Sequence, residues 1–209
     1  SASGASSVVD ACDTSLTFYT PTVLSQSRSD LTGVTIGEYA LFAGGIASGS
    51  TVSNVIDIYN TDLTRGTPIT LTTARYGLEG NTVGDYALFA GGYNETNYFS
   101  SVEVCDPSLV FGTPISLSQA RRALSSVSMG NHVIFAGGYL GSGSNVVDVF
   151  NPSLARSSLT SFSTARWDLA GALVGDYALF AGGNTGSASN AVDAYKKTGK
   201  IILPLSQGS

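Results

Sequence analysis

A seven-residue apolar stretch that ends in two glycines recurs along this chain of 209 residues. It reads Tyr-Ala-Leu-Phe-Ala-Gly-Gly at residues 86–92, and copies or near copies occupy residues 39–45, 132–138 and 177–183. The first glycines of the pairs stand at positions 44, 91, 137 and 182, so 47, 46 and 45 residues separate them. A period of this size is typical of stacked supersecondary units that bury their apolar faces against each other. The chain is therefore predicted to be a repeat protein.

Each repeat contains four short apolar segments with turn-forming residues between them. We call them A, B, C and D; in one set they are residues 33–36, the recurring stretch at 39–45, residues 55–59 and residues 67–71. A two-residue step that begins with glycine, such as Gly84-Asp85, joins A to B, and glycine can take the positive φ of a tight hairpin. Segment D contains Thr-Pro in three copies, as at Thr67-Pro68, and is expected at an outer edge because proline donates no ladder hydrogen bond. Segment A is expected at a crowded central axis because it repeats a very small residue. These residues are Gly33, Gly80, Ser126 and Gly171.

Four antiparallel strands in about 46 residues, with a double glycine closing the second strand, resemble the kelch repeat of β-propellers. The resemblance covers essentially the whole chain. It also rests on an arginine before segment A and an aromatic residue in segment C. These residues are Arg28, Arg75, Arg121 and Arg166, and Tyr59, Phe150 and Tyr195. The tryptophan that kelch repeats usually have in the D strand is missing here.

The resemblance implies an all-β, kelch-like β-propeller with blades of four antiparallel strands, four or five in number. Residues 1–209 would form one domain, with repeats at about 1–45, 46–92, 93–138 and 139–183 and a partial repeat at 184–209. The chain is also similar to kelch-like arrays encoded by bacteria and their phages, which favours an extracellular or virion-surface location.

The strand count is irregular, because there are four A–B hairpins and five C–D pairs. In one closure, which we favour, the first C–D pair docks on the last A–B hairpin and closes a four-bladed ring. Residues from Asn190 onward are then an appendage. In the other, the chain is part of a larger ring that another copy completes, so self-association through unpaired terminal strands is also expected.

Charge and hydropathy exclude two classes of partner. The net charge of −5 and the isoelectric point near 4.6 are unlike those of nucleic-acid-binding surfaces, which cluster lysine and arginine. No apolar run approaches the roughly 20 residues that a membrane-spanning helix needs. We therefore expect neither nucleic acid as a partner nor insertion into a membrane.

The repeats supply an internal control, because a residue found in every copy is more readily explained by the scaffold than by chemistry. An acid recurs in each C segment and an arginine before each A segment, which predicts structural ion pairs. Cys12 and Cys105 occupy the aromatic position of segment C and are expected to be free thiols. His132 stands where other copies have tyrosine. The sequence shows no catalytic triad, phosphate-binding loop or metal-ligand spacing, so no catalytic residue, metal or cofactor is predicted.

Residues that break the repeat pattern are the better candidates for function, and aromatic residues among them gather in the B–C loops and D–A corners. Both kinds of loop open on the same face of a kelch blade. The predicted ligand-binding residues are Arg75, Tyr76, Tyr93, Arg122, Tyr139, Arg166 and Trp167. The same rings could instead cap the blade edges.

Two classes of function remain. The first is a non-enzymatic recognition module that binds a glycan, peptide or protein through this face, since aromatic faces and planar arginine donors suit such ligands. The alternative is a carbohydrate-active hydrolase or lyase, supported by the out-of-pattern acids Glu79 and Glu95. The scarcity of such acids favours the first.

Overall fold

The computed structural model describes residues 4–198 and 201–204, and every regular element in this part of the chain is a β-strand. Because no described residue is helical, this part holds no helix long and apolar enough to cross a membrane. The all-β prediction is confirmed. Alternating apolar and small residues, with a turn signal every few positions, leave no stretch with helical periodicity.

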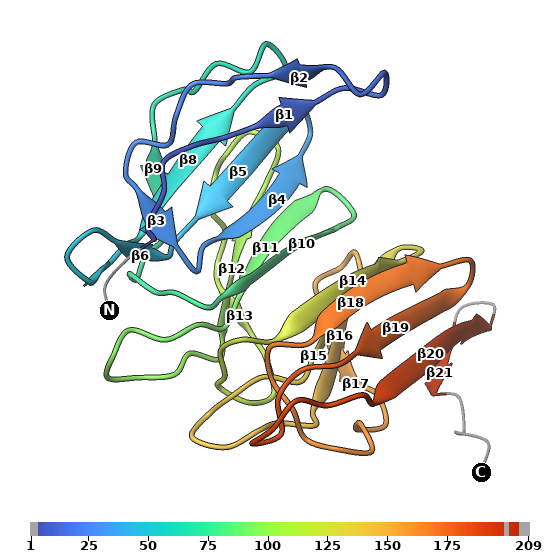
Figure 1. The fold of residues 1–209 in the computed structure, drawn as a ribbon. Coiled ribbons are helices and arrows are strands. Elements are labelled where there is room, and N and C mark those ends of the chain that lie inside the picture. Colours follow the sequence, from blue (N-terminus) through green and yellow to red (C-terminus); the bar gives the residue numbers. More distant parts are fainter. Residues whose placement is uncertain (1–3, 199–200, 205–209) are drawn as a thin grey trace.

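Four four-stranded antiparallel sheets, which we call blades 1 to 4, follow one another along the chain (Figure 1). Blade 1 contains β4 (Thr32–Ile36), β5 (Tyr39–Ala43), β8 (Val55–Tyr59) and β9 (Ile69–Thr70). Blade 2 contains β10 (Glu79–Val83), β11 (Tyr86–Ala90), β12 (Ser101–Cys105) and β13 (Ile115–Ser116). Blade 3 contains β14 (Ser125–Met129), β15 (His132–Ala136), β16 (Val147–Phe150) and β17 (Arg156–Ser158). Blade 4 contains β18 (Ala170–Val174), β19 (Tyr177–Ala181), β20 (Val192–Thr198) and β21 (Ile201–Pro204).

Within each blade the strands are ordered as predicted, with segment A innermost and segment D at the outer edge. The two-residue turns between A and B are confirmed, because Ile36 pairs with Tyr39 and Val83 pairs with Tyr86. The glycine that opens each turn has a φ of 53 to 63°. The inner strands β4, β10, β14 and β18 lie side by side in that order. At Gly171 a Cβ would meet β14, 2.7 Å from a Val127 methyl, so the small residues of segment A permit this close approach.

Five short strands lie outside the blades. β1 (Ala11–Cys12) and β2 (Phe18–Tyr19) form a separate two-stranded sheet, which we call the half-blade because it corresponds to segments C and D alone. β3 (Arg28–Ser29), β6 (Ile46–Ala47) and β7 (Thr51–Val52) form a small three-stranded sheet beside blade 1.

The closure that we favoured from the sequence is wrong. The last A–B hairpin, β18 and β19, pairs with β20 and β21 of the same blade and not with the half-blade. Residues from Asn190 to Pro204 are therefore the outer strands of blade 4 rather than an appendage; residues 205–209 lie outside the described part. Only a ten-residue connection separates β19 from β20, so this pairing costs far less loop-closure entropy than pairing with residues near position 11.

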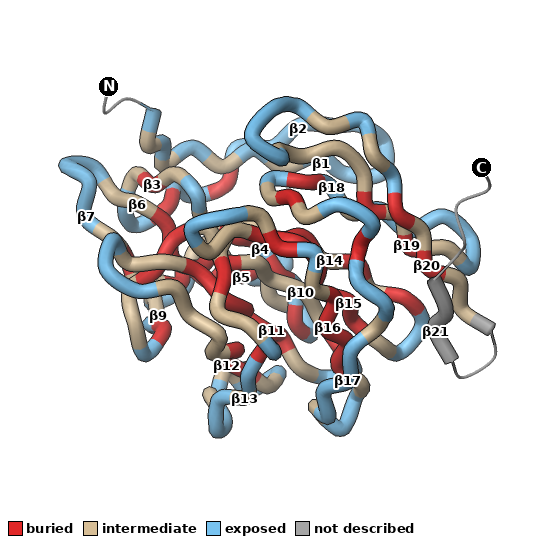
Figure 2. The backbone as a smooth tube through the Cα atoms, turned by 90° about the horizontal axis from the view of Figure 1, so that it is seen from below, coloured by how far each residue is buried: buried red, intermediate tan, exposed pale blue. Residues whose placement is uncertain are grey.

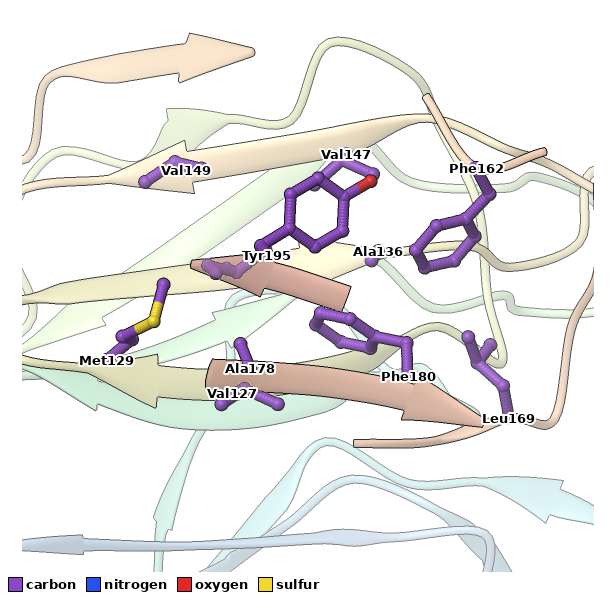
Figure 3. Packing of buried hydrophobic residues seen from close by; sticks show 11 residues of the cluster. Val127, Met129, Ala136, Val147, Val149, Phe162, Leu169, Ala178, Phe180 and Tyr195 are labelled. Atoms are coloured by element: carbon purple, nitrogen blue, oxygen red, sulfur yellow. The ribbon is translucent and has the colours of Figure 1, made fainter. Parts of the chain in front are cut away.

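The apolar core lies between the blades rather than within one sheet. One cluster joins blades 1 and 2, a second joins blades 2 and 3, and a third joins blades 3 and 4. Figure 3 shows the third cluster, in which Ala178 of β19 lies beside Val127 of β14 and the Phe180 ring lies near Tyr195. Stability therefore depends on each blade having a neighbour.

The glycine pairs hold each blade to the next. The amide of the second glycine donates to the carbonyl oxygen of the next blade's arginine, at 2.9 Å for Gly45 to Arg75 and for Gly92 to Arg121. The first glycine of each pair has a φ of about 70°, and a Cβ at Gly91 would lie 2.3 Å from the Arg121 carbonyl oxygen. Two properties of glycine, its conformational freedom and its small size, are both used here.

The arginine side chain then turns into its own blade and meets the acid of segment C, as predicted. Arg75 donates to the Glu103 carboxylate and, at 3.0 Å, to the Gly91 carbonyl oxygen, and both side chains are buried. Glu103 also accepts a hydrogen bond of 2.9 Å from the amide of Thr72, which follows the outer strand of blade 1. Each acid therefore links two blades. The pairs are Arg28–Asp57, Arg75–Glu103, Arg121–Asp148 and Arg166–Asp193.

Candidate functional site

The D–A corners and B–C loops meet on one face because their backbones pair. The residue after each repeated arginine exchanges two hydrogen bonds with the residue after each glycine pair, at 3.0 Å in both directions for Tyr76 and Tyr93. Arg122 pairs with Tyr139 and Trp167 with Asn184 in the same way. The loops that follow β5, β11, β15 and β19 lie along the lower left of Figure 1. This common face, predicted from the sequence, is therefore built by main-chain geometry.

A second set of backbone bonds fixes the spacing between corners. The amide of Gly77 donates to Asp30, that of Ala123 to Gly77, and that of Asp168 to Ala123, at 2.8 to 3.0 Å. All four residues have a φ between 52 and 60°, which is unusual for the three that are not glycine. This ladder sets the distance from Tyr76 to Arg122 and from Arg122 to Trp167.

Five aromatic side chains lie in a continuous series on this face, which we call the aromatic rim. Tyr76 meets Tyr93 edge-on at 5.8 Å between ring centroids, and Tyr98 stacks on Tyr93 at 4.5 Å. Tyr98 contacts Tyr139 at 6.2 Å, and Tyr139 contacts Trp167 at 5.0 Å. The rim crosses blades 2, 3 and 4. Four of these residues were predicted, whereas Tyr98 was absent from the predicted set although it also breaks the loop pattern.

Arg122 lies at the centre of the rim. Its guanidinium carbon is 5.4, 5.7 and 5.6 Å from the ring centroids of Tyr76, Tyr93 and Tyr139. Among the described residues its guanidinium has no ion pair and no hydrogen-bond partner, and its Nε is buried. A half-buried arginine that aromatic faces hold in place, with its donors not engaged in an ion pair, is suited to binding an anionic group.

The polar edge of the rim carries an acid and two phenols. Tyr93 donates from its hydroxyl to the Glu95 carbonyl oxygen at 2.7 Å, which anchors the loop. Burial, followed by the neighbouring Glu95 carboxylate, raises the pKa of Tyr76 to about 12. The Tyr76 phenol therefore stays protonated at neutral pH and remains a hydrogen-bond donor.

Two predicted site residues, Arg75 and Arg166, do not lie on the rim. Arg75 and Arg166 are fully buried, and their guanidinium groups pair with Glu103 and Asp193 inside the blades. A ligand on the rim cannot reach them without breaking a buried ion pair. They follow the repeat pattern, and that signal of a scaffold role outweighs their position beside the aromatic corner residues.

A second polar cluster lies on the inner strands, where blade 2 departs from the repeat. Glu79 and Asn81 of β10 replace the Thr or Ser and the Val found at the same register in blades 1 and 3. The Ser126 hydroxyl donates to Glu79 at 2.7 Å, and the Asn81 amide donates to Ser126 at 2.9 Å. These residues line a cavity of about 430 Å³ that also includes Phe42.

Burial of Glu79 raises the pKa of its carboxyl from 4.5 to about 7, although the hydrogen bonds from Ser126 oppose the shift. Between about pH 4.5 and 7 the folded protein therefore keeps a proton on Glu79 that the unfolded chain has already released. We expect stability to fall as the pH rises through this window, by up to about 3 kcal/mol from this group alone. Glu79→Gln should remove that part of the pH dependence in urea unfolding at pH 5 and pH 8. Glu95→Gln, in an exposed loop, is the matched control, and equal pH dependence in Glu79→Gln and wild type would contradict the assignment.

The opposite face contains a larger cavity, of about 810 Å³, between blades 3 and 4. His132, Asn131, Pro152 and Lys197 are among its lining residues. No group of three His, Cys, Asp or Glu side chains in the described part of the chain is arranged to hold a metal ion.

No family model matches the sequence, and no curated protein matches it. The fold, in contrast, matches solved structures, among them that of YjhT, a bacterial kelch-repeat β-propeller protein. The two structures align with a TM-score of 0.77 over 95% of this chain and 75% of YjhT, at 11% sequence identity. At this identity the likeness concerns the fold. The four sheets are kelch-type propeller blades, as the glycine pairs and repeated arginines predicted.

Proposed function

We propose that this kelch-type propeller chain is a non-enzymatic recognition module that binds a carboxylate-bearing glycan, peptide or protein segment on the aromatic rim. The observation that carries the proposal is Arg122, which has no ion pair and no hydrogen bond among the described residues and lies against three tyrosine rings. The rings supply apolar faces at little cost in side-chain entropy, and the guanidinium supplies planar donors.

The alternative, hydrolysis or elimination on a carbohydrate, has less support from the arrangement of acids. Glycosidases use two carboxyl groups about 5 to 9.5 Å apart on either side of the bond that breaks. Glu79 is the single carboxylate among the residues that line its cavity. Four of the five recurring acids of segment C form ion pairs with buried arginines, and the fifth, Asp10, lies in the half-blade, far along the chain from Glu79.

The proposal is tested by screening the intact protein on glycan and peptide arrays, with a reducing-sugar release assay on the same sample. We expect ligands with a carboxylate to be retained and no sugar to be released. Arg122→Gln and Trp167→Ala should each weaken binding of the best array ligand by about 1–3 kcal/mol, and the melting temperature should change only slightly because neither change leaves a buried charge unpaired. Binding is measured by titration calorimetry.

His132→Ala is the matched control, because His132 lines the cavity on the opposite face. Its affinity should equal that of the wild type. If His132→Ala weakens binding while Arg122→Gln and Trp167→Ala do not, the site lies on the opposite face and the rim residues are blade caps. Sugar release that Glu79→Gln abolishes would instead support the enzymatic alternative.

A further inference from the structure

The half-blade is a blade without its inner strands, and the four complete blades show what is missing. Residues 9–12 correspond to residues 102–105 of β12, so Asp10 occupies the position of Glu103 and Cys12 that of Cys105. In blade 2, β12 lies between β11 and β13. In the half-blade, β1 pairs with β2 along one edge, and no described strand pairs with its other edge.

The half-blade is held together, and is joined to blade 1, by the same hydrogen bonds as an ordinary blade. The amide of Leu24 donates to Ser7 at 2.8 Å, as Leu71 does to Asn54. The amide of Ser25 donates to the Asp57 carboxylate at 3.0 Å, as Thr72 does to Glu103. The half-blade therefore packs on blade 1 in the same register as a complete blade. The edge of β1 that pairs with β2 is complete, and the other edge of β1 is open.

The open side carries an unpaired charge and exposed apolar groups. Asp57, Glu103, Asp148 and Asp193 are buried against an arginine, whereas Asp10 is exposed and has no ion-pair partner among the described residues. Cys105 is fully buried and Cys12 is exposed. Phe18 and Val8 are 77% and 63% exposed. Figure 2 shows the loop around β2 as exposed.

We propose that the open edge of β1 is a docking site for an A–B hairpin of this repeat type that carries the repeat's arginine at its start. The second strand of such a hairpin would add to β1 in the register that joins β11 to β12, which places its alanine and phenylalanine opposite Cys12 and Asp10. Its arginine would pair with Asp10, as Arg75 pairs with Glu103. Two features identify this hairpin as the occupant: its arginine complements the charge of Asp10, and its second strand continues the sheet of the half-blade.

The lengths of the B–C loops show where such a hairpin can be attached to the chain. Eight residues separate Gly138 from Val147, and eight separate Gly183 from Val192. Eight residues also precede Val9, which is the corresponding position of the half-blade. A copy of residues 75–92 joined directly before Ser1 therefore has a B–C loop of native length, and the covalent link gives the hairpin a high effective concentration.

The experiment measures alkylation of Cys12 in the native protein, with and without this extension. Burial raises the pKa of Cys105 to about 11, so Cys12 supplies the reactive thiol in the unextended chain. We expect the extension to slow the reaction of Cys12 by roughly tenfold or more, because docking buries the thiol. An extension whose first arginine is replaced by glutamine, and an Asp10→Asn chain with the native extension, should each lose most of this protection.

Unchanged reactivity of Cys12 in the extended chain would overturn the proposal. So would equal protection by the native and the arginine-free extensions, since the Asp10 pairing would then have no role. Protection that grows with protein concentration in the unextended chain would show that a second copy covers this edge, which also contradicts the proposed occupant.

Discussion

Replacing Glu103 with glutamine is expected to lower the free energy of unfolding by about 3–5 kcal/mol, because the change leaves the Arg75 charge buried without a partner. Both side chains are essentially inaccessible to solvent, at 0 and 1% exposure. Glutamine keeps the shape and one acceptor, so the loss reflects charge rather than volume. The same change also weakens the link to Thr72 of blade 1. Urea unfolding followed by circular dichroism measures the effect.

Asp10→Asn is the matched control, because Asp10 holds the same repeat position in the half-blade but is exposed and pairs with no arginine in the described part of the chain. Its substitution should change the free energy of unfolding by less than about 0.5 kcal/mol. Similar losses in the two variants would mean that the segment C acids act through something other than the buried ion pair.

Gly91→Ala is expected to cost about 3 kcal/mol or more. A Cβ at this position would lie 2.3 Å from the Arg121 carbonyl oxygen, which is backbone and cannot move aside without separating blades 2 and 3. The positive φ of 68° adds a further cost of about 1 kcal/mol for a residue with a Cβ. The melting temperature of the variant should fall accordingly.

Gly182 allows the two costs to be separated, because it has the same φ of 68° in blade 4 and its Cβ would meet nothing nearer than 3.7 Å. Gly182→Ala should therefore cost about 1 kcal/mol, the conformational part alone. If Gly91→Ala were no more destabilising than Gly182→Ala, the glycine pairs would serve only the turn and not the contact between blades.

The scaffold could be predicted because each structural feature that builds it appears in every repeat. The glycine of each A–B turn, the glycine pair and the arginine with its acid are local or nearest-neighbour features, so one copy explains the others. The closure could not be predicted in this way. Residues 8–24 and 191–204 have the same segment types, and the choice between them is made by loop length rather than by residue type.

The candidate site was predicted in outline, and its details depend on contacts that the repeats do not share. The face follows from the loop pattern, but the stacking of Tyr98 on Tyr93 depends on a B–C loop that the other blades lack. The position of Arg122 depends on the corner ladder, in which Ala123 takes a φ of 53°. The repeat pattern separates Arg121, which recurs in every copy, from its neighbour Arg122, but it does not show that three tyrosine rings surround Arg122.

That pair of neighbours tests most directly the central claim, which is that repeated residues build the scaffold and pattern-breaking residues form the recognition surface. Urea unfolding of Arg121→Gln and Arg122→Gln is the measurement. We expect Arg121→Gln to lose about 2 kcal/mol or more, because Asp148 loses its buried partner and keeps only the partly exposed Arg156. Arg122→Gln should lose no more than about 1 kcal/mol, because it removes cation–π contacts but leaves no buried charge unpaired. Equal destabilisation by the two substitutions, or a larger loss at Arg122, would contradict the claim.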